Sequence, residues 1–208
     1  MRSDSRQAHW EGVYTKKGEK EVSWFEENPA ASLELIAQVG ATPVFAIIDI
    51  GGGASRLVDN LVDRGFEDVT VLDLSEAALE AAKGRLGGRT ARVHWIVADA
   101  TVWEPPLEAY GIWHDRAAFH FLTEDPDRAA YVARLERALK VGGYAIIATF
   151  ALDGPERCSG LPVVRYDPVS LGKALGPTFQ LVDTRLHAHA TPWGSTQSFQ
   201  FSVFRRCP

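Results

Sequence analysis

The chain has 208 residues, 46% of them hydrophobic, which favours one α/β domain with a full core over two small, poorly buried domains. Its 22 basic and 27 acidic residues give a formal net charge of −5. This balance argues against a protein whose main task is to hold nucleic acid, because such proteins usually present a basic face. We therefore expect no nucleic-acid partner. No run of about 18 apolar residues occurs either, so we expect no membrane partner.

The cysteines and the first residues of the chain bear on its location. Cys158 and Cys207 lie far apart, without the spacing of a zinc site or a disulfide framework. The N-terminal residues lack the apolar stretch of a signal peptide. We therefore expect a cytoplasmic protein with free thiols.

The first half of the chain alternates between strand and helix patterns. After 27 polar residues with scattered aromatics, Asn28 has the character of an N-cap, with Pro29 at the first helical position and Gly40 at the helix end. A continuous apolar run over 44–50 predicts a buried parallel strand, and a glycine turn follows it at once. Further strands are expected over 69–72 and 93–98, and helices over 57–62 and from Ser75 onward.

The second half continues this pattern and then departs from it. Strands are expected over 109–113 and 144–150, separated by a helix that begins at Asp125 and ends at Gly142 and Gly143. A short helix from Pro168 precedes two strands, 179–188 and 197–205, whose turn at 192–194 predicts an antiparallel hairpin. The expected fold is α/β, a doubly wound and mostly parallel seven-stranded sheet with a C-terminal antiparallel hairpin and helices on both faces.

Acidic residues stand at three successive strand ends, next to the glycine turn. Asp49 precedes the three glycines at 51–53, Asp73 ends the second strand, and Asp99 follows the third. The carboxyl ends of parallel strands share the rim where open α/β sheets bind ligands. A carboxylate at Asp73 can accept hydrogen bonds from both ribose hydroxyls of an adenosine, and the glycine turn lets a ligand approach the backbone. The alternative is that these aspartates only cap the helices that follow.

Five segments carry a family resemblance: DIGGGAS (49–55), VLDLS (71–75), VADA (97–100), HDRAAFHFL (114–122) and VGGYAIIATF (141–150). In this order the chain resembles a class I, Rossmann-like S-adenosylmethionine-dependent methyltransferase. The resemblance implies S-adenosyl-L-methionine as cofactor, and Ser55 departs from it where many members have a third glycine. It also implies a cofactor site made by Asp49, Gly51, Gly52, Gly53, Asp73, Leu74, Asp99 and Ala100.

Two aromatic segments near the N-terminus extend the resemblance. HWEGVY and SWFEENP are similar to the N-terminal part of methyltransferases related to the elongation-factor and citrate-synthase lysine methyltransferases. This implies that Tyr14 and Trp24 face the cofactor, where ring faces attract a sulfonium cation. The alternative is that these rings only pack across the edge of the sheet.

The segment after the fourth strand holds the candidate catalytic residues. His120 and His114 are candidate bases, and Asp115 could orient an acceptor, whereas the alternative places all three in structural roles. DRAAFHFL resembles both the DKGT-type motif of protein lysine methyltransferases and a DRGA stretch of small-molecule thiol methyltransferases. His187 and His189 share one face of a strand, but no third ligand is evident, so we predict no metal site.

These observations lead to one leading hypothesis. We expect a single methyltransferase domain over 1–208, with an N-terminal cap over 1–40, a cofactor-binding core over 41–150, and an acceptor loop with the closing hairpin over 151–208. The methyl acceptor is expected to be a small molecule, with a protein lysine as the alternative. An NAD-dependent oxidoreductase and a non-catalytic cofactor-binding module are alternatives of another class.

Overall fold

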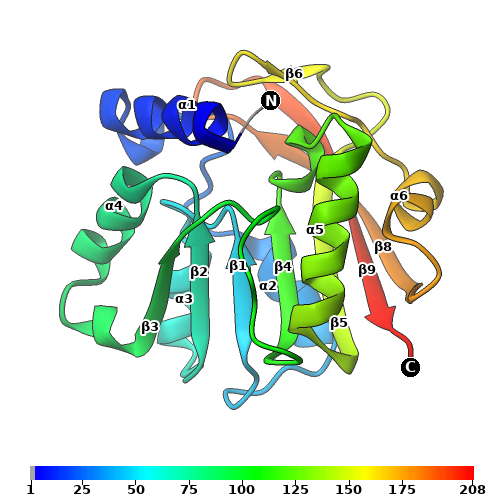
Figure 1. The fold of residues 1–208 in the computed structure, drawn as a ribbon. Helices are drawn as coiled ribbons and strands as arrows, with labels where there is room; N and C mark the ends of the chain where they lie inside the picture. The colour runs from blue at the N-terminus through cyan, green and yellow to red at the C-terminus, as the bar shows by residue number, and fades with distance from the viewer. Residues whose placement is uncertain (1–2) are drawn as a thin grey trace.

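The protein is a mixed seven-stranded sheet between two layers of helices (Figure 1), in a computed structural model that describes residues 3–208. The first five strands run parallel to one another, while β9 is antiparallel to both of its neighbours. The predicted fold class is confirmed. The strands in spatial order are β3 (Val93–Val97), β2 (Val69–Asp73), β1 (Ile47–Ile50), β4 (Tyr110–Arg116), β5 (Leu139–Phe150), β9 (Thr196–Arg206) and β8 (Phe179–Ala190).

Along each buried strand, alternate side chains pack against the two helical layers. Ile47 and Ile112 pack with the first layer, whereas their neighbours Ile48 and Trp113 pack with the second, as the two-residue period of a strand requires. The first layer contains α2 (Ala30–Gln38), α3 (Leu57–Asp63) and α4 (Glu76–Leu86); the second contains α5 (Asp125–Ala138) and α6 (Pro168–Leu175).

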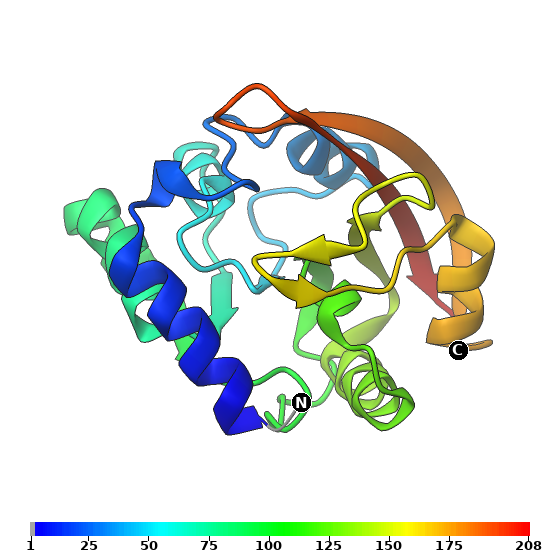
Figure 2. The same ribbon diagram turned by 90° about the horizontal axis from the view of Figure 1, so that it is seen from above.

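The carboxyl ends of the parallel strands are covered by segments from both ends of the chain. An N-terminal helix, α1 (Ser3–Lys16), lies across them beside α4, and a small ribbon of β6 (Arg157–Cys158) and β7 (Leu161–Pro162) lies on the same side (Figure 2). Strands β1 and β4 are neighbours although β2 and β3 come between them in the chain, so the strand order reverses there. Open α/β sheets bind ligands at such a point.

Two helix boundaries differ from the sequence prediction. Helix α2 begins at Ala30 after Pro29, and no side chain caps its N-terminus, so the predicted cap at Asn28 was wrong. Helix α5 ends at Ala138 because Leu139 already has extended dihedral angles and begins β5. The predicted glycine stop therefore lies inside that strand, where Gly142 has a φ of +80°.

Three short 3₁₀ helices complete the described chain: η1 (Glu19–Glu21), η2 (Gly87–Arg92) and η3 (Phe119–Phe121). Among residues 3–208, no helix has both the length and the apolar character needed to cross a membrane.

Candidate active site

The glycine turn after β1 packs directly against two carboxylates. A Cβ at Gly52 would lie 2.6 Å from Oδ2 of Asp49, and one at Gly53 would lie 2.7 Å from Oδ2 of Asp73. Gly51 and Gly53 also have positive φ angles of 66° and 36°. Only glycine fits a backbone that makes this bend so close to other groups. The turn and the first two predicted carboxylates therefore converge.

Asp73 ends β2 as a buried carboxylate, with 6% of the residue exposed. Its Oδ1 accepts a hydrogen bond of 2.8 Å from the backbone N–H of Ser75. Burial raises its pKa to about 7, and the nearby charge of Asp49 acts in the same direction. Hydroxyl donors would relieve the cost of burying this charge, and a ribose offers two of them.

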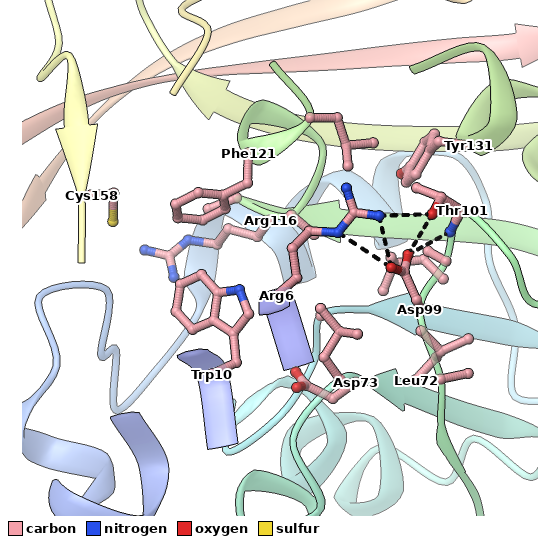
Figure 3. A pocket seen from close by; sticks show the side chains of 18 of the residues that line it. Arg6, Trp10, Leu72, Asp73, Asp99, Thr101, Arg116, Phe121, Tyr131 and Cys158 are labelled. Carbon is pink, nitrogen blue, oxygen red and sulfur yellow. Dashed lines mark hydrogen bonds and ion pairs between the residues drawn. The ribbon is translucent and has the colours of Figure 1, made fainter. Parts of the chain in front are cut away.

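The carboxylate of Asp99 is engaged by the protein itself. Its Oδ1 accepts hydrogen bonds from the backbone N–H and the hydroxyl of Thr101, at 2.8 and 2.7 Å. Its Oδ2 accepts from Arg6 Nη2 at 2.8 Å (Figure 3). Arg6 Nη1 also contacts Asp127 at 2.6 Å. An adenine at this end of the sheet would therefore be bound mainly by the backbone near Ala100, because the Asp99 side chain already has these partners.

Replacement of Arg6 by alanine is expected to lower the free energy of unfolding by about 3 kcal/mol. The guanidinium is 8% exposed and lies between two carboxylates, and removing one partner of a buried ion pair leaves an uncompensated charge. Chemical denaturation would measure the loss, and amide hydrogen exchange should quicken selectively in α1. The exposed Arg64 supplies the control, since Arg64→Ala should stay within about 0.5 kcal/mol of wild type. Equal stability of both variants would show that this anchor is weak.

A second anchor ties α1 to the helix that follows β2. Oε2 of Glu11 accepts a hydrogen bond of 2.8 Å from the hydroxyl of Ser75 and one of 3.3 Å from the N–H of Ala77. These groups form the N-terminus of α4, where a negative charge is favourable. The N-terminal helix is therefore fixed at both of the strand ends that carry Asp73 and Asp99.

Aromatic rings form one wall of the space below α1. Trp10 makes edge contacts with Trp24 and Phe121 at centroid separations of 5.7 and 4.9 Å. The indole N–H of Trp24 donates to the hydroxyl of Tyr14 at 3.1 Å. The sequence offered two alternatives for these rings, facing the cofactor or packing. Tyr14 and Trp24 contact each other and also line the cavity below the helix, so this packing leaves them in position to face a cofactor bound there.

This main cavity joins the carboxylate end to the aromatic end without interruption (Figure 3). An adjoining cavity reaches the glycine turn from the other side and includes Asp49 and Gly52. Every residue predicted to bind the cofactor lines one of the two cavities, except Gly53, which packs against Asp73. The main cavity is lined by charged, aromatic and thiol side chains, among them Arg6, Tyr14, Trp24, Asp73, Arg116 and Cys158.

Arg116 and Cys158 lie at the aromatic end, and their environments differ from those of a free cation and a reactive thiol. The guanidinium of Arg116 donates to the carbonyl of Trp24 at 2.8 Å, and its Nη2 lies 3.1 Å from Glu26 Oε1. Burial raises the pKa of Cys158 to about 11. The cysteine is therefore a thiol at neutral pH and a poor nucleophile.

Two of the three candidate catalytic residues are held in structural networks. The ring of His114 spans Asp49 Oδ1 at 2.7 Å and the hydroxyl of Ser32 at 2.9 Å, and so joins β4, β1 and α2. Asp115 accepts hydrogen bonds from the N–H groups of the η3 turn and from the hydroxyl of Tyr131 at 2.6 Å. Burial raises the pKa of Asp115 to about 6. Neither residue is among those that line the main cavity within the described chain.

The third candidate, His120, is fully buried beside Phe121 and Phe150. Its Nδ1 accepts the backbone N–H of Phe150 at 3.3 Å, and burial, together with the charge of Arg116, lowers its pKa to about 3. His120 is also absent from the lining of both cavities in the part of the chain that the structure describes. This geometry gives no support to the predicted role as a base.

His120→Ala is accordingly expected to reduce stability by about 1–3 kcal/mol, as a cavity forms in the core, without moving the pH profile of kcat. Thermal denaturation and turnover between pH 5.5 and 9 would measure the two effects. The exposed His94 provides a control through His94→Ala. Loss of the acidic limb of the profile in His120→Ala alone would restore the residue as a base.

The site fits S-adenosylmethionine on its own geometry. The glycine turn leaves no room for side chains, the buried carboxylate of Asp73 can accept hydroxyl donors, and aromatic rings at the far end can face a sulfonium. Sequence reasoning missed Arg6, Glu11, Arg116 and Phe121. Arg116 could have been found from the sequence, because it lies in the segment HDRAAFHFL (114–122) directly after Asp115.

Comparison with known proteins agrees with this geometry. A family model described as a methyltransferase domain matches residues 47–143. The chain is 25% identical over 151 residues to the eEF1A lysine and N-terminal methyltransferase of Bos taurus, covering 69% of this chain and 21% of that protein. It is 31% identical over 127 residues to the trans-aconitate 2-methyltransferase of Rhizobium rhizogenes, covering 61% of this chain and 46% of the relative. The chain thus spans about a fifth of the length of the first of these relatives.

Solved structures match over nearly the whole chain. A protein described for the conversion of a disulfide bond into a thioacetal group during echinomycin biosynthesis superposes with a TM-score of 0.80 at 20% identity, covering 97% of this chain and 92% of that one. The 1,6-didemethyltoxoflavin-N1-methyltransferase of Burkholderia thailandensis, with bound S-adenosylhomocysteine, gives a TM-score of 0.71 at 21% identity, covering 99% and 87%. Together these findings show that residues 47–143 match a methyltransferase domain and that the chain has the fold of the class I S-adenosylmethionine-dependent methyltransferases.

Proposed function

We propose that the protein transfers the methyl group of S-adenosylmethionine to a small molecule. The observation that carries this proposal is the one cavity that Asp73 and Asp99 line on one side and Phe121 and Cys158 on the other (Figure 3). In this proposal the nucleoside would lie beside the strand ends and the acceptor beyond it. The methyl group would then pass between the two ends.

The chain supplies binding and orientation. When bound, S-adenosylmethionine supplies a methyl group activated by a sulfonium. Asp73 would accept the ribose hydroxyls, and the glycine turn with Asp49 would hold the methionine portion. The rings of Tyr14 and Trp24 would face the positive sulfur. Helix α1, fixed by Arg6 and Glu11, would keep water from the cavity.

The acceptor end suggests a nucleophile that needs little help to lose a proton. Neither candidate base lines the main cavity, although His114 lines the adjoining one. Burial keeps Cys158 protonated and also raises the pKa of Tyr14. Transfer to an aligned acceptor can then rest on positioning, which supplies much of the rate of such reactions. A carboxylate is already ionised at neutral pH, and a thiol loses its proton more readily than an amine. These two acceptor groups suit the site best.

A small acceptor is also favoured by what covers the cavity. Helix α1 and the β6–β7 ribbon both lie over the carboxyl ends of the parallel strands (Figure 2). Arg6, Trp10 and Tyr14 of α1 and Cys158 of the ribbon line the cavity. A lysine on a folded protein would need an open channel to reach the same place. A protein acceptor remains the second candidate, because a matching relative is named for methylation of lysine and an N-terminus on eEF1A.

The free Cys158 and Cys207 support a cytoplasmic location.

Calorimetric titration with S-adenosylhomocysteine and with NAD tests the cofactor. We expect saturable binding of S-adenosylhomocysteine and none of NAD. Binding of NAD alone would favour the oxidoreductase alternative. Binding of S-adenosylhomocysteine without turnover on any acceptor would favour a non-catalytic module.

The acceptor is tested with cofactor labelled in its methyl group. Parallel incubations would contain panels of carboxylic acids, thiols and amines, and a lysate separated into macromolecules and metabolites. Label in the carboxylic acid or thiol products is the expected result. Label confined to protein would overturn the proposal of a small-molecule acceptor and favour a lysine methyltransferase.

A further inference from the structure

Three metal-ligating side chains converge away from the main cavity, where the N-terminal segment meets the C-terminal hairpin. Glu26 lies between η1 and α2, and His187 and His189 lie on β8. One ligand atom of each lies within 4.8 Å of the other two. The sequence pointed to the histidine pair but offered no third ligand, and the fold supplies one from a residue 161 positions away. We propose that these residues bind a divalent transition-metal ion, with Zn²⁺ as the best match.

The spacing of the ligand atoms suits one shared ion. Glu26 Oε1 lies 3.1 Å from His189 Nδ1 and 3.4 Å from His187 Nε2. With zinc–ligand bonds of about 2.0–2.1 Å, two ligands of a tetrahedral ion stand about 3.3 Å apart. Both observed separations lie near this value, and imidazole with carboxylate is a usual ligand set for zinc.

The other nitrogen of His189 fixes which atom is free to bind. Nε2 lies 2.6 Å from the carbonyl oxygen of Ser23, so the ring donates its N–H there. In the neutral ring, Nδ1 then presents a lone pair toward Glu26 Oε1, and two acceptors face each other at 3.1 Å. A cation between them, either a metal ion or a second ring proton, removes this conflict. A backbone carbonyl that orients a histidine in this way is common behind metal sites.

The site is open to solvent on one side. His187 is one-third exposed, whereas His189 is buried. A surface groove lined by Phe25, Asn28 and Pro192 gives access to the three ligands and leaves space for water as a fourth. Three protein ligands with one open position are thus available to an entering ion.

The site shares Glu26 with the active-site wall. Arg116 Nη2 lies 3.1 Å from the same Oε1, and Arg116 also holds the carbonyl of Trp24. The carboxylate of Glu26 has lone pairs for more than one partner. Arg116 nevertheless competes with the metal ion for its negative charge, which lowers the affinity of the site for the ion. A bound ion would link the segment before α2 to β8. Through Glu26 and Arg116 it would also restrict the motion of Trp24 at the cavity.

The test is a titration of the full chain with Zn²⁺ against a chromophoric chelator, in a Cys207→Ser background that removes the exposed thiol. We expect one equivalent of zinc, and binding at least tenfold weaker in His187→Ala, since His187 is partly exposed and its loss should leave the fold intact. His94→Ala, which removes an exposed histidine on β3, should bind like the parent. A crystal soaked in Zn²⁺ should show anomalous density between the three side chains.

Two results would overturn the proposal. Absence of zinc binding by the parent would mean that a proton on His189, not a metal ion, resolves the contact with Glu26. Equal affinity of His187→Ala and the parent would place the zinc elsewhere. Because the readout is metal binding, neither result depends on whether the protein transfers methyl groups.

Discussion

Asp73→Asn is expected to weaken binding of S-adenosylhomocysteine about 10- to 100-fold while making the unliganded protein more stable at neutral pH. The carboxylate is buried at the end of β2, and the cost of holding a charge there raises its pKa to about 7. Hydrogen bonds to a charged acceptor contribute about 1.5–3 kcal/mol, so the amide should lose most of the cofactor's attachment. The uncharged amide should also remove the cost of burying a charge in the unliganded protein, which makes that protein more stable.

The pH dependence of this difference follows from the direction of the shift. Between about pH 4 and pH 7 the unfolded chain has released the proton of Asp73 while the native state retains it, so the free energy of unfolding falls as the pH rises. Each pKa unit corresponds to about 1.4 kcal/mol, which makes the full effect a few kcal/mol. Affinity for S-adenosylhomocysteine should run the other way and rise through pH 7. Both slopes should be reduced in Asp73→Asn.

Denaturation and calorimetric titration at pH 5, 6, 7 and 8 would test both slopes, and Asp63→Asn, at an exposed carboxylate of α3, is the control. Opposite changes in stability and affinity identify a binding role, because a residue that only supports the fold would lose both together. Unchanged affinity in Asp73→Asn would remove this residue from the site.

Gly52→Ala should have the second large effect. The added methyl group would lie 2.6 Å from Asp49 Oδ2 and 2.8 Å from Val71 Cγ1, both closer than normal contact. Overpacking of this kind costs about 1–3 kcal/mol. Displacement of Asp49 would also disturb its 2.7 Å contact with His114. We expect lower stability and at least tenfold weaker binding of S-adenosylhomocysteine.

Gly84→Ala is the matched control for this substitution. Gly84 lies inside α4 with no atom within 4 Å of the added Cβ, so alanine should stabilise the protein by about 0.5–1 kcal/mol. Melting temperatures and binding isotherms of the two variants should therefore move apart. If both bound the cofactor like wild type, the turn would be less constrained than its contacts indicate.

Local patterns were sufficient to predict the sheet and one end of the site. β1 and the second half of β5 are apolar runs, the glycines follow β1 directly, and Asp73 is the last residue of β2. Position along the chain therefore also determined position in space. The start of a helix at Ser75 was predicted for the same reason, and Ser75 is the N-cap of α4. The stop of α5 was not, because packing of Leu139 in the sheet outweighed the turn preference of the glycines.

The parts that were missed depend on contacts between distant segments. Helix α1 has no apolar stripe, and it is held by Arg6, whose partner Asp99 lies 93 residues away. The depth of His120 depends on rings from β5, so its sequence position looked like that of a base. Glu26 meets His189 across 163 residues. No periodicity in the chain encodes such pairs.

The anchoring of α1 has a consequence for turnover. Its two ties, through Arg6 to Asp99 and through Glu11 to the start of α4, end beside the place where the nucleoside would lie. S-adenosylhomocysteine would therefore leave after α1 moves away from the strand ends. This movement first breaks the ion pair of Arg6 and the hydrogen bonds of Glu11. Arg6 and Asp99 form a buried ion pair, which added salt screens only weakly. The release of S-adenosylhomocysteine should therefore depend little on ionic strength.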